Sequence, residues 1–181
     1  MEISNKELKR FEELLDEHIG ENLATFEYKG FVYVSKNIPG VVEKVSFALD
    51  FSLSTIAKAA AQGANILFCF HCPEELNFSI NRDKEAMIEL ENNSISLYKC
   101  HLPLNFSSAG LNALACSIMT AEAFPEVFIL DDKKIMGGVY RLKNTFTIEQ
   151  IIEMVKKLSP VDIHVYNHQP NRIYKNVLFA S

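Results

Sequence analysis

The chain has 181 residues, of which 48% are hydrophobic and 23% are charged, and its formal net charge is -5. This composition is that of a folded globular protein and excludes a disordered chain. Lys and Arg form no cluster dense enough to follow a phosphate backbone, and the N-terminus lacks the apolar core of a signal peptide. No run approaches the roughly eighteen apolar residues of a membrane helix. We therefore expect a cytoplasmic protein that binds neither nucleic acid nor membrane.

The first 130 residues alternate between strand and helix patterns. Ser4 and Glu7 have capping-box spacing, and apolar residues at helical intervals predict a helix over 5–19. A strand interrupted at Gly30 is expected over 26–34. Four apolar runs, separated by three helical patterns, then predict a mostly parallel sheet covered by helices, which is an α/β fold. The runs are 45–49, 66–70, 95–98 and 127–130, and the helices are 53–62, 82–92 and 108–119.

After residue 130 the pattern changes to a β-α-β-β segment. We expect a strand at 139–142, a helix at 147–158 that begins with a Thr cap and ends near Pro160, and strands at 161–166 and 176–180. This segment either continues the sheet or forms an α+β appendage. The chain is therefore divided into an α/β domain at 1–130 and a C-terminal segment at 131–181.

Polar side chains follow the expected parallel strands. Asp50 ends one strand, His71 and Cys72 end the next, and His101, with Asn105 one turn later, follows the third. Ligands of open α/β sheets bind at the carboxyl ends of the strands, where loops converge. Imidazole and thiolate both suit Zn or Fe, so His71 and Cys72 are candidate metal ligands.

Each of these residues also has a structural interpretation. A buried Cys can act as a small hydrophobe, and a His can hold a loop through a backbone hydrogen bond. Asp50 can cap the helix that begins near Ser52, and Asn105 can serve as a turn residue. The sequence leaves both interpretations open.

The thiols suggest a third possibility. Four cysteines without a secretory signal argue against a disulfide framework. Cys69 and Cys72 form a C-x-x-C, but in thioredoxin-like proteins this motif opens a helix, whereas Pro73 and a polar loop follow it in this chain. Nucleophilic catalysis by Cys72 with His101 stays open as a thiol-based alternative.

The order of several short motifs resembles the NIF-three-like family, whose members are often labelled GTP cyclohydrolase 1 type 2 homologues. The resemblance runs over about residues 26–180. It implies a di-metal centre on an α/β fold, a ring-shaped homo-oligomer and a hydrolase activity. The motifs are VSFALD at 45–50, AAAQGANIL at 59–67, His71-Cys72-Pro73, the segment 98–105, AGLNALA at 109–115 and GGVYR at 137–141.

Carried over motif by motif, the family's metal ligands fall on four positions. The first family His falls on His71 and the second on Cys72. The His of its His-x-x-Leu-Asp falls on His101, and the Asp of that motif falls on Asn105. A later His and Glu pair of the family has no counterpart before Ser181. Two neutral imidazoles without a carboxylate do not hold a pair of divalent ions tightly.

Two functions follow from this comparison. The favoured one is a divergent, C-terminally short family member with an incomplete di-metal site and no bound metal, which is non-catalytic and acts through homo-oligomerisation or a protein partner. The alternative is a metal-dependent hydrolase that keeps one divalent transition metal, Zn, Fe or Mn, through His71 and its neighbours.

Overall fold

A computed structural model describes residues 5–19, 27–77, 79–107, 110–118, 121–130, 135–158, 162–166 and 169–180. The chain divides into two compact units, Met1–Pro103 and Leu104–Ser181. The expected division after residue 130 falls inside the second unit. The helices are α1 (Lys6–Ile19), α2 (Leu53–Ala61), α3 (Asn81–Asn92), α4 (Leu102–Phe106), α5 (Leu111–Ile118) and α6 (Ile148–Leu158). The strands are β1 (Gly30–Tyr33), β2 (Val45–Asp50), β3 (Ile66–His71), β4 (Ser96–Lys99), β5 (Ala121–Leu130), β6 (Ile135–Thr147) and β7 (Ile173–Ala180).

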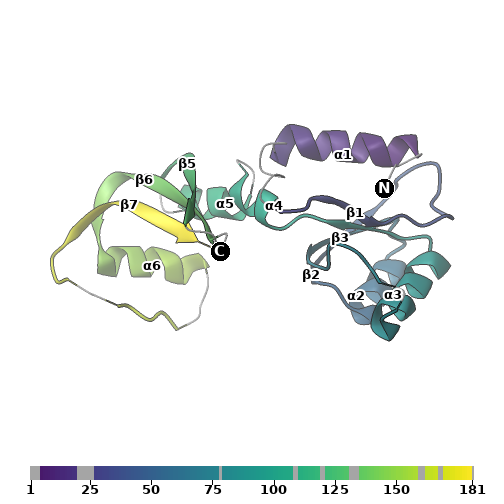
Figure 1. The fold of residues 1–181 in the computed structure, drawn as a ribbon. Helices are drawn as coiled ribbons and strands as arrows, with labels where there is room; N and C mark the ends of the chain where they lie inside the picture. Colours follow the sequence, from purple (N-terminus) through teal and green to yellow (C-terminus); the bar gives the residue numbers. More distant parts are fainter. Residues whose placement is uncertain are drawn as a thin grey trace. The chain divides into compact units, whose positions relative to one another are not determined.

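The first unit contains a four-stranded sheet in the order β1-β4-β3-β2. Strands β2, β3 and β4 run parallel, as predicted, and β1 pairs antiparallel with β4. Helix α1 lies over one face of this sheet, and α2 and α3 lie over the other (Figure 1). Because both faces are covered, the central strand β3 is apolar and buried from Ile66 to Cys69.

The two faces of this sheet have different cores. Under α1, the ring of Phe11 packs against Phe31 and Tyr98, with centroids 6.1 and 5.4 Å apart. On the opposite face, Leu67 and Leu97 belong to a cluster that also takes in Ile56 of α2 and Leu90 of α3. Alternate residues of a strand point to opposite faces, so each strand contributes to both cores.

Strand β2 comes last in the strand order β1-β4-β3-β2 and is therefore an edge strand of the sheet. Two of its large apolar side chains are mostly exposed, Phe47 at 71% and Leu49 at 61%. Phe47 still contacts the next strand, since its ring centroid lies 5.2 Å from that of Phe68. The edge of the sheet is therefore apolar and accessible at two positions.

The second unit contains an antiparallel sheet in the order β5-β6-β7. The prediction that the run 127–130 forms a fourth parallel strand is therefore wrong, because this run is the end of β5. Only four residues separate β5 from β6 in the sequence, and parallel pairing of these two strands would need a crossover of about a dozen residues. The two strands therefore pair antiparallel. Leu142 is buried and packs with Phe146, Met154, Val155 and Val177.

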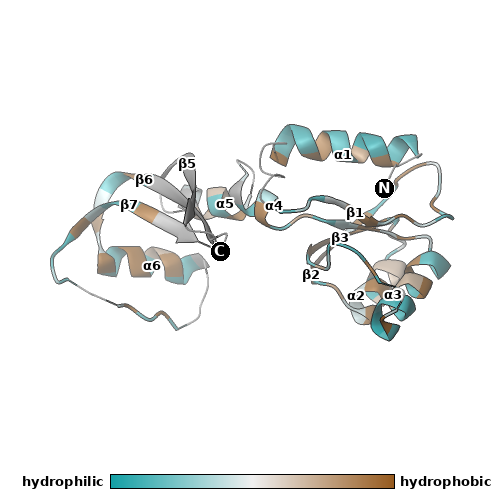
Figure 2. Ribbon diagram, in the orientation of Figure 1, coloured by the Kyte–Doolittle hydropathy of each residue, from teal (hydrophilic) through white to brown (hydrophobic). Residues whose placement is uncertain are grey.

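Other boundaries differ less. The helix expected over 108–119 is the shorter α5, and the preceding α4 was not predicted. Residues 162–166 are not in a strand, which corrects the expected strand over 161–166; Val161 lies outside the described residues. Helix α6 matches its prediction and carries both hydrophobic and hydrophilic residues along its length (Figure 2). None of the helices in the described part of the chain is long and apolar enough to cross a membrane.

Candidate functional site

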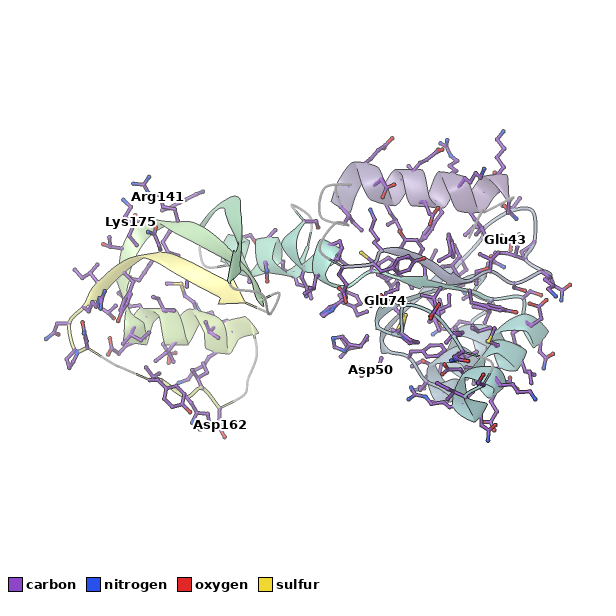
Figure 3. All side chains as sticks on the ribbon, viewed as in Figure 1. Glu43, Asp50, Glu74, Arg141, Asp162 and Lys175 are labelled. Carbon is purple, nitrogen blue, oxygen red and sulfur yellow. The ribbon has the colours of Figure 1, made fainter. Side chains whose placement is uncertain are left out.

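The candidate site lies at the carboxyl ends of the parallel strands of the first unit. In the strand register, Asp50 of β2 is opposite His71 of β3, and Cys69 of β3 is opposite Lys99 of β4. His101 follows β4 by two residues. Figure 3 labels Asp50 at the end of β2 and Glu74 in the loop that follows β3. Parallel pairing therefore gathers these polar residues at one edge of the sheet.

His71 is paired with Asp50. Its Nδ1 atom lies 2.9 Å from Oδ1 of Asp50, and both side chains are largely exposed. The helix-capping role considered for Asp50 belongs instead to Ser52, whose Oγ accepts the Thr55 N–H at 3.2 Å. When Nδ1 of His71 donates to the carboxylate, Nε2 is left as a free acceptor, which is how protein carboxylates orient metal-binding histidines.

His101 is likewise paired with a carboxylate, that of Glu27. Its Nδ1 atom lies 3.4 Å from Oε2 of Glu27. The rings of His71 and His101 meet edge to face, with centroids 4.8 Å apart and planes at 85°. The structure thus brings two imidazoles together, each with a carboxylate at Nδ1, as the strand ends predicted for the two histidines.

Glu27 and Lys99 are members of this cluster that the sequence analysis missed. Glu27 accepts hydrogen bonds from the Leu102 N–H at 2.8 Å and forms an ion pair with the buried Lys99 ammonium at 3.2 Å. Burial by itself would raise the pKa of Glu27, but these hydrogen bonds outweigh it, so the pKa is lowered. Glu27 lies just before β1 in the sequence. The antiparallel pairing of β1 with β4, in which Gly30 is opposite Lys99, brings it to this cluster. No motif in the sequence signals that pairing.

Cys72 is half-buried and donates to the Pro73 carbonyl at 3.4 Å. A hydrogen bond with Cys69, together with burial, raises the pKa of Cys72 far above its usual value. The same hydrogen bond lowers the pKa of Cys69. A metal binds the thiolate form, so an ion at Cys72 would first have to displace this proton.

Asn105 belongs to the second unit, where it lies in α4. Its side chain is buried, and its Oδ1 has no hydrogen-bond partner among the described residues. A buried carbonyl without a partner is unusual in a native protein. Unlike the carboxylate expected at this position, however, the amide brings no negative charge to a cation.

These donors do not fit a pair of divalent ions. In the first unit, two imidazoles and a thiol with a raised pKa bring no negative charge of their own to two cations, although two-metal sites rely on carboxylates for that. Among the residues that the structure describes, no group of three or more His, Cys, Asp or Glu side chains is placed to hold a metal. His71 and His101 would supply two of the three protein ligands that a catalytic zinc usually has.

Comparison with known proteins gives matches along almost the whole chain. Residues 9–180 match the model of a family described as Duf34/NIF3 (NGG1p interacting factor 3). A protein of Methanocaldococcus jannaschii described as a GTP cyclohydrolase 1 type 2 homolog is 32% identical over 132 residues, covering 68% of this chain and 49% of that protein. One of Lactococcus lactis with the same description is 25% identical over 132 residues, covering 69% and 50%. The chain thus spans about half the length of the curated relatives it matches.

Solved structures are similar in fold. Reduced HcgD from Methanocaldococcus jannaschii has a TM-score of 0.64 and 28% identity, covering 86% of this chain and 61% of that one. The protein ybgI has a TM-score of 0.68 and 17% identity, with coverage of 95% and 68%. Staphylococcus aureus SA1388 has a TM-score of 0.67 and 16% identity, with coverage of 95% and 70%. At these low identities the last two share the fold alone.

Proposed function

Because the chain belongs to the Duf34/NIF3 family, we propose that it is a divergent member with an incomplete di-metal site. It acts by assembling with further copies of itself or by binding a protein partner, and not by two-metal hydrolysis. The same proposal includes the absence of a stoichiometric metal ion.

The donor chemistry at the strand ends carries this proposal. Two-metal hydrolysis needs two ions a few ångströms apart that share a bridging oxygen and are held by anionic ligands. In this chain the imidazoles of His71 and His101 bring no negative charge to a cation, and the hydrogen bond with Cys69 and burial raise the pKa of the Cys72 thiol. Cys72 and Asn105, where the resemblance implies a histidine and an aspartate, therefore lack the ligand chemistry that a second ion requires.

Metal content and molar mass test the proposal. The chain is purified without chelator, its Fe, Zn and Mn are counted by mass spectrometry, and its mass in solution is measured by light scattering. We expect much less than one ion per chain and a particle mass that is a multiple of 20.5 kDa. One or two ions per chain, lost in His71→Ala, together with hydrolysis of phosphoester or nucleotide substrates, would contradict it.

A second function is favoured by one observation, the carboxylates behind both imidazoles. Asp50 and Glu27 face Nδ1 of His71 and His101 and leave both Nε2 atoms to a ligand. A hydrolase with a single metal ion, completed by a donor from elsewhere, would use such an arrangement. This second candidate function uses one metal ion and has no second ion.

Added metal distinguishes the two functions. If the single-ion hydrolase is correct, Asp50→Asn weakens Zn or Mn binding by about 10- to 100-fold, which is the usual effect of losing a carboxylate behind a histidine ligand. Asp162→Asn, an exposed position in the second unit, is the matched control and should bind like the wild type. Equal binding by the two variants would remove the single-ion candidate.

A further inference from the structure

Lys99 is a buried lysine at the last position of β4. Its side chain is 7% exposed, and in the sheet register the residue lies between Gly30 of β1 and Cys69 of β3. Lysine is almost never buried without a partner, because removing an ammonium group from water is costly. Lys99 therefore needs negative charge close to it, at the strand ends where the candidate site lies.

Two carboxylates supply this charge, one beside each neighbouring strand. Nζ of Lys99 lies 3.2 Å from Oε1 of Glu27, just before β1, and 3.9 Å from Oε1 of Glu74, in the loop after β3. The side chain of Glu27 is 18% exposed and that of Glu74 is 65% exposed. The attraction between charges is stronger where water is excluded, so the pair with Glu27 is the stronger of the two.

Glu27 connects the ammonium group to the imidazoles. Its Oε1 atom faces Lys99. Its Oε2 atom accepts the Leu102 N–H at 2.8 Å and lies 3.4 Å from Nδ1 of His101. The ring of His101 in turn meets that of His71. A positive charge that belongs to the protein thus lies among carboxylates and an imidazole, which are the side chains that bind divalent metal ions.

We propose that the Lys99 ammonium is the resident cation of this cluster and keeps divalent metal ions out of it. The ammonium compensates the charge of Glu27 and Glu74 by direct contact, as a bound ion would do. It also repels any further cation that comes within a few ångströms. The inference rests on the proposed function and deepens it, because it names the residue whose charge replaces that of a metal ion.

Removal of the ammonium tests the proposal on the full chain. In Lys99→Ala the two glutamates lose their cation, and Glu27, Glu74 and His101 remain as three donors for a divalent ion. Wild type and variant are stripped with chelator and dialysed, and zinc or manganese chloride is titrated into each in a calorimeter. We expect Lys99→Ala to bind the ion at least about 10-fold more tightly, because a positive charge a few ångströms away no longer opposes it.

Three further variants separate the charge of Lys99 from other effects. Lys99→Arg keeps the positive charge and should bind as weakly as the wild type. Lys29→Ala removes a different lysine of the first unit, whose ammonium pairs with Asp16 of α1, and should gain no binding. The double variant Lys99→Ala with His101→Ala should lose the gain, because one of the three donors is then missing.

Thermal stability gives a second readout that is independent of any activity. Lys99→Ala leaves the charge of Glu27 uncompensated, so its melting temperature should fall below that of the wild type. Added zinc should restore part of this loss, because a ligand that binds the folded state stabilises it. The same zinc should leave the melting temperature of the wild type unchanged.

The proposal is overturned if Lys99→Ala folds but binds the ion no more tightly than the wild type, or if Lys99→Arg gains as much. If Lys99→Ala does not fold, Lys99→Gln replaces it, since its amide still donates to Glu27 but carries no charge. The proposed function is decided separately, by the metal content of the wild type before any chelator is added. Stoichiometric metal there contradicts the proposed function, whereas the difference between variant and wild type decides the role of Lys99.

Discussion

The two units of the chain use sheets of different kinds, and the parallel sheet of the first unit gathers polar residues where its strands end. In the first unit β2, β3 and β4 run parallel, so their carboxyl ends lie at one edge and bring Asp50, His71 and His101 together. In the second unit, neighbouring strands of the β5-β6-β7 sheet run in opposite directions. The carboxyl ends of successive strands therefore lie alternately at the two opposite ends of the sheet. The candidate site is thus a consequence of strand direction as much as of residue type.

Each unit has a core of its own. Among the side chains that the structure describes, the largest fully buried ones lie in the first unit, on both faces of its sheet; they are Tyr98, Phe68, Leu8, Ile56, Ile66, Leu67, Leu90, Ile95 and Leu97. In the second unit, the buried apolar side chains that the structure describes are Leu142 and Ile151. Substitutions in the two cores can therefore show whether the units are stabilised separately.

The largest effect is expected from Leu97→Ala. Leu97 is completely buried in β4, between neighbours on both sides in the sheet. Removing its side chain should lower the free energy of unfolding by about 3 kcal/mol, through lost burial and the cavity that remains. Urea unfolding combined with hydrogen exchange measures this loss. Leu49→Ala, at an exposed position of β2, is the control and should change stability by less than about 0.5 kcal/mol.

A smaller loss, about 2 kcal/mol, is expected from Leu142→Ala, whose surroundings are partly buried and can relax more. Hydrogen exchange should accelerate in peptides from Leu104–Ser181 and stay unchanged in Met1–Pro103. Equal acceleration in both units would mean that the chain unfolds as one cooperative body, and the comparison between the units would fail.

The smallest effect is expected from Glu91→Gln and should depend on pH. The Tyr33 hydroxyl and the Lys36 N–H donate to Glu91, and the Tyr33 bond is the main cause of its lowered pKa. A carboxyl whose folded pKa lies below its ordinary 4.5 stabilises the fold above that pH, and the stabilisation is lost as pH falls through the folded value.

Denaturation of wild type and Glu91→Gln at several pH values measures this contribution. The wild type should be more stable at about pH 7, and the difference should shrink toward about pH 3, because protonation removes the charge that the variant lacks. A difference that stays constant over this range would show that the charge of Glu91 does not contribute. Asp162→Asn, remote from Tyr33 in sequence and exposed, provides a baseline for the loss of one carboxylate.

Much of the first unit follows from periodicity in the sequence. Apolar residues at helical spacing predicted α1, α2 and α3, and short apolar runs predicted β2, β3 and β4 and their parallel order. The meeting of His71 and His101 followed from that order, since parallel strands end at one edge. Their role as metal ligands stays a prediction, as do the roles of Cys72 and Asn105.

Other features carry no local signal. An apolar run such as 127–130 predicts a strand but does not say which sheet it joins, and so β5 was placed in the wrong one. Glu27 and Lys99 meet only because β1 pairs antiparallel with β4, a contact between residues far apart in the sequence. The apolar residues near 161–166 have strand propensity, but residues 162–166 make no sheet partner in the structure.

The exposed edge of β2 gives a further role to the charged residues at its two ends, Lys44 and Asp50. Phe47 and Leu49 make the strand apolar at an open edge, a combination that favours strand addition between molecules and precipitation. Lys44 precedes this strand and Asp50 ends it, and charges that flank an apolar strand oppose aggregation. A variant that removes the carboxylate of Asp50 will therefore be less soluble, and its binding should be compared with the wild type in dilute solution.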